Sequence, residues 1–255
     1  MIPKIIHYCW FGPGKMTKLE KRCIASWKKV LPDYAIKCWD ESNFDINYNN
    51  FTKDAYKAGK FAFVSDVARL HAIYHVGGIY MDTDMFMLKS LDQFLIHPFF
   101  IGHYRPGELA VGIFGCEKGN HVTEILLKAY QRIKFDQQNL HTIPNHFDLV
   151  VDQEHLHDKM VIYSPEFFYP LPFEKKNENY EKYITTNTMA VHLWNHSWKD
   201  EFSSLKNFDF MASISLHFKN VFSCNAEFKS ANYFKRYYKS LYYNFKRYLY
   251  NVFKK

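Results

Sequence analysis

Two aspartates separated by one residue, Asp82 and Asp84, are the clearest chemical signal in the sequence. They follow the apolar run Ile79-Tyr80-Met81, which predicts a buried strand. Successive side chains of a strand alternate between its faces, so the pattern predicts that both acids point the same way. Neighbouring carboxylates repel each other, and a bound divalent ion such as Mg2+ or Mn2+, which prefers oxygen ligands, would relieve that repulsion. The alternative is a pair of solvated turn residues.

A second charged pair precedes these acids. Asp66 and Arg69 are three residues apart, which places them on one face of a predicted helix with Ser65 as its N-cap. Gly77 and Gly78 are predicted to end this helix and to turn the chain back, so that the pair lies beside the two acids. The alternative is an exposed ion pair worth less than about 1 kcal/mol.

The combined pattern resembles the sugar-transferase region with a D-x-D motif of glycosyltransferase family 32. The residues that carry the resemblance are Ser65-Asp66, Arg69, Gly77-Gly78, Tyr80, Asp82 and Asp84. The resemblance implies an α/β protein with a GT-A-like, Rossmann-type nucleotide-binding fold and a mixed sheet. It also implies a retaining glycosyltransferase that uses a nucleotide-sugar donor, for which we expect a UDP-sugar, and a divalent metal, Mn2+ or Mg2+.

The family includes bacterial capsule and lipopolysaccharide transferases. The resemblance therefore implies a glycan or a lipid-linked oligosaccharide as the acceptor, and a role in surface polysaccharide synthesis. Three alternatives from other classes remain: a metal-dependent phosphohydrolase, a non-catalytic carbohydrate-binding protein and a basic-tailed scaffold.

Two further motifs resemble the family at either end of this region. The run Ile2 to Phe11 predicts a first strand, and Trp10 near its end matches a position that stacks on the nucleobase; the alternative is a core tryptophan. The run from 190 to 199, AVHLWNHSWK, resembles the family's closing motif. It implies that His192 is a metal ligand and that Ser197 and Trp198 contact the diphosphate. The alternative for His192 is a core histidine with satisfied hydrogen bonds.

These resemblances imply a division of labour among the candidate residues. Asp82, Asp84 and His192 would bind the metal, and Asp66 with Arg69 would hold the hydroxyls of the donor sugar. No residue is assigned as a nucleophile, because retention in the family is described as attack on one face of the sugar without one.

The rest of the first half predicts alternating strands and helices. Helical spacing covers Thr17 to Val30, a strand covers Ala35 to Trp39, and Phe44 to Gly59 predicts a loop or short helices. This order is typical of a parallel nucleotide-binding unit.

In the second half, two strands at 99–102 and 110–115 are predicted to flank a loop at 104–109. A helix covers Asn120 to Phe135, and a strand and turn follow at 161–172. The histidines at 121, 141, 146, 155 and 157 are predicted to lie at the surface.

Composition limits the class of protein. With 255 residues, of which 47% are hydrophobic, the chain can bury one sizeable core. Its five cysteines form an odd set without a C-x-x-C pair, which argues against a disulfide framework or a zinc knuckle. No apolar run resembles a signal peptide or reaches the roughly 18 residues that a membrane span needs. The sequence therefore predicts a cytoplasmic protein whose mature chain begins near Met1.

The C-terminal tail differs from the rest. We expect a catalytic domain at 1–222 and a basic, aromatic helical tail at 223–255. Residues 228–255 contain eight Lys or Arg and no acid, although the net charge of the whole chain is only +7. The predicted apolar stripe is Phe234, Tyr238, Leu241, Phe245, Tyr248 and Val252, with Lys235, Arg236, Lys239, Lys246, Arg247 and Lys254 opposite.

Such a helix would lie on an anionic membrane, on the inner face of the membrane for a cytoplasmic protein. The alternatives are docking on the catalytic domain and dimerisation. Nucleic acid is not expected as a partner, because no matching basic patch is visible elsewhere.

Overall fold

The computed structural model describes residues 1–136, 143–195, 205, 208, 210–221 and 231–253. The contacts within the chain divide it into two units, Met1–Asn195 and His196–Lys255. Helix α8 (Phe210–Val221), which precedes the predicted boundary between residues 222 and 223, belongs to the same unit as the tail.

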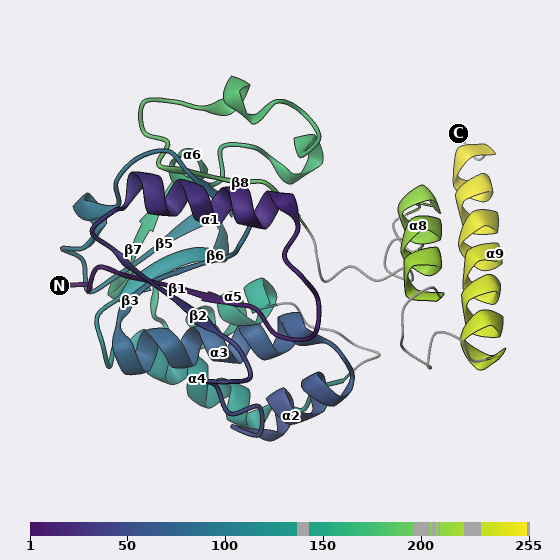
Figure 1. The fold of residues 1–255 in the computed structure, drawn as a ribbon, viewed down its shortest axis with the longest axis horizontal. Coiled ribbons are helices and arrows are strands. Elements are labelled where there is room, and N and C mark those ends of the chain that lie inside the picture. Colours follow the sequence, from purple (N-terminus) through teal and green to yellow (C-terminus); the bar gives the residue numbers. More distant parts are fainter. Residues whose placement is uncertain (137–142, 196–204, 206–207, 209, 222–230, 254–255) are drawn as a thin grey trace. The chain divides into compact units, whose positions relative to one another are not determined.

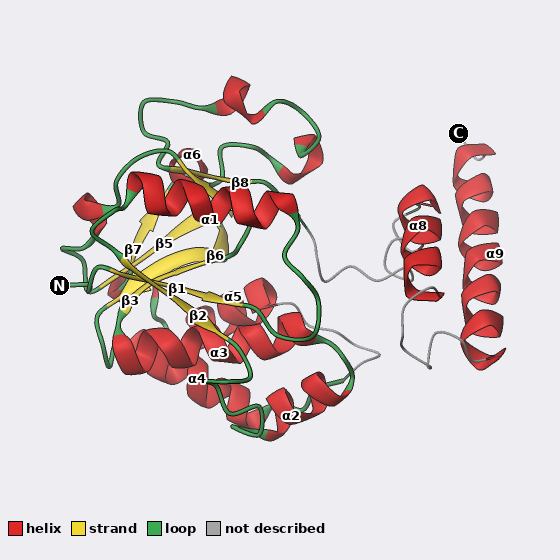
Figure 2. Cartoon of the chain, in the orientation of Figure 1, coloured by secondary structure: helices red, strands yellow, loops and turns green. Residues whose placement is uncertain are grey.

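The first unit alternates strands and helices along the chain (Figures 1 and 2). Its strands are β1 (Ile5–Cys9), β2 (Ala35–Trp39), β3 (Gly78–Met81), β4 (Met85–Met87), β5 (Phe99–Arg105), β6 (Glu108–Cys116), β7 (Val161–Tyr163) and β8 (Ala190–His192). Its α-helices are α1 (Lys18–Val30), α2 (Asn50–Lys57), α3 (Phe61–Val76), α4 (His121–Arg132), α5 (Ile143–Gln153) and α6 (Pro165–Phe168). Four short 3-10 helices are η1 (Asp92–Phe94), η2 (His157–Lys159), η3 (Phe173–Lys175) and η4 (Tyr180–Tyr183).

The main sheet has six strands in the order β2-β1-β3-β6-β5-β7. Strand β1 pairs in parallel with both β2 and β3, β6 is antiparallel to β3 and β5, and β7 is parallel to β5. A separate antiparallel pair joins β4 to β8. The predicted fold class, an α/β protein with a mixed sheet and C-terminal helices, is confirmed.

Helices cover both faces of this sheet, and the strands supply side chains to each face in turn. Figure 1 shows α1 over one face and α2, α3, α4 and α5 over the other. Along β3, Ile79 and Met81 pack in the core beneath α1, whereas Tyr80 packs in the core beneath α3. The alternation follows from the two-residue period of a strand and explains why nearly every residue of β3 is apolar.

Two helices show how the sequence sets their ends. Helix α1 begins after Thr17, whose side chain accepts a hydrogen bond from the backbone N–H of Leu19, and Glu20 completes a capping box. The predicted helix start at Ser65 is wrong. Helix α3 begins at Phe61 with Lys60 in the N-cap position, five residues before Ser65, and the Ser65 hydroxyl donates instead to the Phe61 carbonyl (3.2 Å).

The predicted double-glycine exit from α3 is confirmed. Gly77 and Gly78 have φ of 73° and 118°, a region that costs other residues strain. A Cβ on Gly78 would lie 2.6 Å from the Ile5 carbonyl oxygen, so glycine also allows β3 to approach β1 closely.

Three smaller expectations differ from the structure. The predicted loop at 104–109 is mostly strand, because β5 and β6 extend towards each other into a hairpin with Gly107 at its turn. His146 is not a surface residue: its Nε2 is buried and its ring packs on Tyr130, 4.7 Å between ring centres. His121, His155 and His157 are exposed as predicted, and His141 lies outside the described residues.

The second unit contains α8 and α9 (Ala231–Phe253), which pack through stacked and hydrogen-bonded His and Tyr side chains. The His217 ring of α8 stacks on Tyr237 of α9, with 3.8 Å between ring centres, and its Nδ1 lies 3.0 Å from the Tyr233 hydroxyl. The buried stripe of α9 therefore runs through Tyr233, Tyr237 and Asn244, and not along the predicted apolar stripe. Of that predicted stripe, Tyr238, Phe245, Tyr248 and Val252 are exposed.

Among the described residues, no helix combines the length and the apolar character that crossing a bilayer requires. The four cysteines in the described part of the chain are free thiols, and Cys224 lies outside it.

Candidate active site

The carboxyl ends of β1 and β3 lie side by side, because the two strands are parallel neighbours. Strand order reverses at β1, which has β2 on one side and β3 on the other. In open α/β sheets, ligands bind beyond the carboxyl ends of the strands at such a point. Trp10 directly follows β1, and Asp82 directly follows β3.

The two acids of the D-x-D motif lie in a turn, so the prediction that both are on a strand is wrong. Strand β3 ends at Met81, where the Asp82 N–H donates to the Gly112 carbonyl (2.7 Å). The chain then turns through Asp82 to Asp84 and starts β4 at Met85, whose N–H donates back to the Asp82 carbonyl (3.0 Å). The turn, and not strand alternation, brings the two carboxylates together.

Asp82 is paired with Arg69, and the predicted placement of the Asp66–Arg69 pair beside the acids is what the structure shows. Arg69 Nη1 lies 3.2 Å from Asp82 Oδ1 and donates to the Val111 carbonyl (3.0 Å). Its Nη2 donates to Asp66 Oδ1 (3.1 Å), and Nε donates to the Ser65 carbonyl (3.3 Å). The pair is buried, so the alternative of an exposed ion pair is excluded.

Burial is the largest influence on the pKa values of Asp66 and Asp82. It raises the pKa of Asp66 to about 7, although Arg69 opposes the change. Burial also raises the pKa of Asp82, against the opposing effect of Arg69, and Asp84 adds to the rise. The Tyr80 hydroxyl donates to Asp82 Oδ1 (2.9 Å), so this acid is held by a cation and a neutral donor together.

Asp84 has a different partner, His192. Strands β4 and β8 pair with Met85 opposite His192, which brings His192 Nε2 within 3.0 Å of Asp84 Oδ1. Burial alone would raise the pKa of Asp84, but His192 and the N–H of Asn195 outweigh it and lower that pKa. Burial alone would lower the pKa of His192, yet Asp84 and then Asp82 outweigh it and raise that pKa.

The three groups fit a divalent ion. One ligand atom from each of Asp82, Asp84 and His192 lies within 4.8 Å of the others. His192 Nδ1 is buried and has no hydrogen-bond partner among the described residues, which is unusual for a nitrogen in a polar cluster. Two carboxylates and one imidazole are ligands that Mn2+ accepts, whereas Mg2+ prefers oxygen alone.

Trp10 is partly exposed at the end of β1, so it is not a core tryptophan. Its indole N–H donates to the Gly14 carbonyl (2.7 Å), which fixes the ring beside the segment Gly12-Pro13-Gly14. Ser197 and Trp198, the other predicted donor contacts, lie outside the described residues.

Residue spacing did not identify several residues that hold the acids in place. The backbone N–H of Asn195 donates to Asp84 Oδ2 (2.7 Å). Gly112 leaves room for Asp82, since a Cβ there would lie 3.0 Å from both Asp82 Oδ2 and the Tyr169 hydroxyl. A glycine in the middle of β6 was a usable sign of close approach, whereas nothing in the sequence pointed to Asn195.

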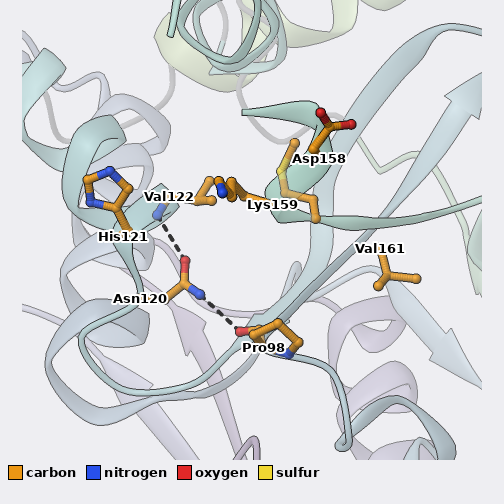
Figure 3. A pocket seen from close by; sticks show the side chains of 8 residues that line it. Pro98, Asn120, His121, Val122, Asp158, Lys159 and Val161 are labelled. Carbon is orange, nitrogen blue, oxygen red and sulfur yellow. Dashed lines mark hydrogen bonds between the residues drawn. The ribbon is translucent and has the colours of Figure 1, made fainter. Parts of the chain in front are cut away.

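A separate pocket lies at the other end of the strands, away from the carboxyl ends where the two acids lie. It has a volume of about 300 Å³ and is lined by Pro98, Asn120, His121, Val122, Asp158, Lys159, Met160 and Val161 (Figure 3). Pro98 precedes β5 and Met160 precedes β7, so the pocket is at the amino ends of strands that run parallel to β3. None of the candidate site residues lines it.

Residues 17–101 match the family model described as "Glycosyltransferase sugar-binding region containing DXD motif". Over these residues, the chain is similar to the sugar-binding region of this glycosyltransferase family. The match contains Asp66, Arg69, Asp82 and Asp84, and the predicted resemblance to glycosyltransferase family 32 agrees with it.

Curated relatives of this glycosyltransferase region are similar over about half of the chain. Inositol phosphoceramide mannosyltransferase 3 of Schizosaccharomyces pombe is 28% identical over 149 residues, which are 53% of this chain and 39% of that protein. An uncharacterized glycosyltransferase of Acanthamoeba polyphaga mimivirus is 28% identical over 145 residues, 50% of this chain and 55% of that protein. The matched segments thus cover well under two thirds of these relatives.

Solved structures that resemble the chain include a glycosyltransferase involved in the glycosylation of the major capsid of PBCV-1. That structure has a TM-score of 0.48 and 10% identity, over 76% of this chain and 95% of the other. The PaToxG glycosyltransferase has a TM-score of 0.47 and 19% identity, over 60% of this chain and 69% of the other. We assign the fold from the strand order and not from these distant likenesses.

Proposed function

We propose that this glycosyltransferase-family chain is a metal-dependent, retaining enzyme that transfers a sugar from a UDP-sugar to a glycan or a lipid-linked acceptor in surface polysaccharide synthesis. The observation that carries the proposal is the cluster of Asp82, Asp84 and His192 at the carboxyl end of β3. It occupies the edge of the sheet where an α/β fold binds nucleotides.

In this proposal Asp82, Asp84 and His192 hold a divalent ion, with Mn2+ preferred because of the imidazole. The bound ion would supply electrostatic stabilisation of the diphosphate as negative charge develops on it. The residues themselves keep the three ligand groups together before any donor binds, since each acid already has its own cationic partner.

Asp66 and Arg69 are proposed to hold the hydroxyls of the donor sugar, which fixes its orientation. Their position beside Asp82 supports this role. All three nitrogens of Arg69 are already engaged, so a contact with the sugar would replace one of these bonds. Asp66, with its raised pKa, is the better placed of the two to exchange partners.

Trp10 is proposed to stack on the nucleobase, and Ser197 and Trp198 to contact the diphosphate. The place of Trp10 after β1, next to the glycine turn at 12–14, supports its role. For Ser197 and Trp198 the support is the sequence motif alone.

The names of the relatives bear on the acceptor. An inositol phosphoceramide mannosyltransferase is, by its name, a transferase of mannose to a lipid. This supports a lipid-linked acceptor for the present chain and makes mannose a donor sugar to test beside galactose and glucose.

The experiment is a melting-temperature screen of the full chain against UDP and GDP sugars, each with and without Mn2+. A ligand that binds the native state alone raises stability by mass action, by about 2.7 kcal/mol at one hundred times its Kd. We expect a shift that needs both a nucleotide sugar and Mn2+. Release of phosphate from simple esters without transfer would indicate a phosphohydrolase, and binding of glycans without nucleotide a carbohydrate-binding protein.

Asp84→Asn tests the metal assignment within that screen. The variant keeps the size of the side chain but removes its charge, so metal-dependent turnover should be lost while the metal-free protein still folds. Full activity with tight Mn2+ binding in this variant would break the assignment.

We also propose that the second unit binds an anionic membrane surface, as a protein on the inner face of the membrane. Its support is the exposure of Tyr238, Phe245 and Tyr248 together with the exposed Lys235 and Lys239 on one helix. Exposed aromatic side chains suit the headgroup region, and basic side chains suit anionic phosphates.

Charge variants test this without disturbing the buried stripe of α9. Lys235, Lys239 and Lys246 are exposed, and replacing all three by Gln should weaken binding to phosphatidylserine vesicles about a hundredfold, at about 1 kcal/mol for each charge. The matched control replaces Lys21, Lys53 and Lys57, which are exposed in the first unit, and should bind as the wild type does. Equal binding by both triple variants would reject the proposal, as would unchanged binding after removal of residues 228–255.

A further inference from the structure

Glu20 is a buried carboxylate that lies outside the predicted site. It occupies the third position of α1 and is 2% exposed, although a capping-box glutamate is ordinarily a surface residue. Its Oε2 accepts from the backbone N–H of Thr17 (2.6 Å) and from the Thr17 hydroxyl. The helix N-terminus favours this negative charge, but a buried carboxylate also needs a partner for its second oxygen.

That partner is Asn195, whose side-chain amide donates to Glu20 Oε1. The backbone N–H of the same residue donates to Asp84 Oδ2 (2.7 Å). Asn195 therefore connects two acids that are 64 residues apart in sequence, one at the start of α1 and one in the D-x-D turn.

The segment that carries Asn195 is held in an unfavourable backbone conformation. Trp194 has a φ of 54°, which bulky residues rarely adopt. On one side of it, the Leu193 N–H donates to the Asp84 carbonyl (3.0 Å), and on the other side Asn195 donates to the Asp84 carboxylate. The turn at Trp194 thus directs the N–H groups of the residues before and after it to one aspartate, and such strain persists only where surrounding contacts fix it.

Helix α1 supplies a fixed point for this connection. The Trp27 indole N–H donates to the Met85 carbonyl (2.6 Å), and the Met87 N–H donates to the Ser26 hydroxyl (2.9 Å). Both bonds are buried and join α1 to β4, the strand that directly follows Asp84. Glu20 consequently holds Asn195 against the same structural frame that carries Asp84.

We propose that Glu20 is a positioning residue for the metal ligand Asp84 and acts through Asn195. The inference rests on the proposed metal-dependent function. In the absence of the Glu20 contact, the backbone at Trp194 would be free to leave its strained conformation, and the carboxylate of Asp84 would lose the Asn195 N–H that fixes its second oxygen. Groups that orient a metal ligand typically change metal affinity 10–100-fold when they are removed.

The test is direct Mn2+ binding by the full chain, measured by calorimetry without nucleotide or acceptor. Asn195→Ala removes the side-chain amide and leaves the backbone N–H, and we expect Mn2+ to bind about tenfold more weakly. Glu20→Ala should weaken binding equally. Glu20→Gln retains an oxygen that can accept from Asn195 and should restore the affinity to within threefold of the wild type.

The double variant Glu20→Ala/Asn195→Ala tells whether the two residues affect Mn2+ binding through one chain of contacts or independently of each other. If the two residues act in series, the double variant binds Mn2+ as weakly as either single variant. Losses that multiply, or a loss of less than threefold in Asn195→Ala, would overturn the inference.

Thr17→Ala is the matched structural control. It removes the cap of α1 but leaves Glu20 and Asn195 paired, so the melting temperature should fall by about 2–4 °C while the Mn2+ Kd stays unchanged. A weaker Kd in this variant would mean that helix stability alone sets metal affinity, which contradicts the proposal.

Asp84→Asn distinguishes a failure of the proposed metal-dependent function from a failure of the positioning role alone. If it binds Mn2+ as the wild type does, or if the wild type binds none, the metal-dependent function fails and the positioning role fails with it. If it binds weakly while Asn195→Ala binds normally, the positioning role alone is wrong.

Discussion

The surroundings of two buried histidines, His7 and His192, differ in one respect: acids surround only one of them. His7 lies in β1, where its Nδ1 accepts from the Trp39 indole (3.0 Å) and its Nε2 donates to the Gly77 carbonyl (2.8 Å). Because an indole N–H can only donate, these bonds fix the neutral tautomer of His7. His192 instead faces Asp84 and Asp82, which favour its charged form.

The difference teaches how one residue type serves two purposes in the same protein. Burial lowers the pKa of His7 to about 4, so this ring is a neutral link between β1, β2 and the end of α3. The acids raise the pKa of His192, so this ring carries a proton that a metal ion could replace. We infer that His7 holds the strands in place and that His192 takes part in the chemistry.

The largest effect expected from this comparison is a loss of stability in acid that depends on His7. Its pKa is about 4 in the folded protein and about 6.5 when unfolded, so the unfolded state takes up the proton first as the pH falls. The free energy of unfolding should be unaffected above pH 6.5 and should decrease by about 3 kcal/mol between pH 6.5 and 4.

Urea denaturation of wild type and His7→Gln across this range checks the prediction. The variant should lose less stability than the wild type between pH 6.5 and 4, by about the stated amount. Parallel pH curves for the two proteins would show that His7 is not the neutral, buried link described here.

A smaller effect is expected when His192 is removed. His192→Ala should weaken Mn2+ binding 10–100-fold, since one of three ligands is lost, whereas His7→Gln should leave it within twofold. Calorimetric titration of both variants measures this, and equal losses would mean that fold stability and not ligation controls affinity.

The pH dependence of metal binding should follow His192. Its pKa is raised, so below that pKa the ion must displace a proton, and Mn2+ affinity should fall about tenfold for each pH unit. In the metal-free protein the free energy of unfolding changes in the opposite direction, because it decreases as the pH rises. The His192–Asp84 pair stabilises the fold below pH 6.5, and this contribution is lost as the pH rises through the raised pKa. Mn2+ affinity that is constant across pH 5.5 to 8 would contradict the assignment.

The smallest effect concerns the donor that keeps His7 neutral. Trp39→Phe keeps an aromatic ring but removes the indole N–H, which should cost about 1 kcal/mol at pH 7.5. It also frees His7 Nδ1 to take a proton, so the loss of stability in acid that is attributed to His7 should be smaller. A larger acid loss in this variant than in the wild type would refute the tautomer assignment.

Local sequence rules predicted the elements whose causes are local. Strand β2 has the predicted bounds, and α1 covers Lys18–Val30 where helical spacing predicted a helix from Thr17 to Val30, because periodicity acts within a few residues. The start of α3 was missed because Phe61 begins the helix without a side-chain cap, so no signal precedes it.

The residues of the site could be predicted from the sequence, but the contacts between them could not. Asp66, Arg69, Asp82, Asp84 and His192 come together as the resemblance implied. The repulsion between the two acids predicted a bound dication, whereas in the structure Arg69 and His192 already pair with one acid each. Those pairings, like the contact from Glu20 to Asn195, depend on which strands lie side by side. Sequence spacing alone does not fix that arrangement.

The most direct test of the account is a crystal of the full chain soaked with MnCl2 and UDP, with anomalous diffraction used to locate manganese. We expect one manganese site within about 2.5 Å of oxygens of Asp82 or Asp84 and of a nitrogen of His192, with the uracil ring over Trp10. Manganese absent from this cluster, with both acids still paired to Arg69 and His192 and no nucleotide bound, would contradict it.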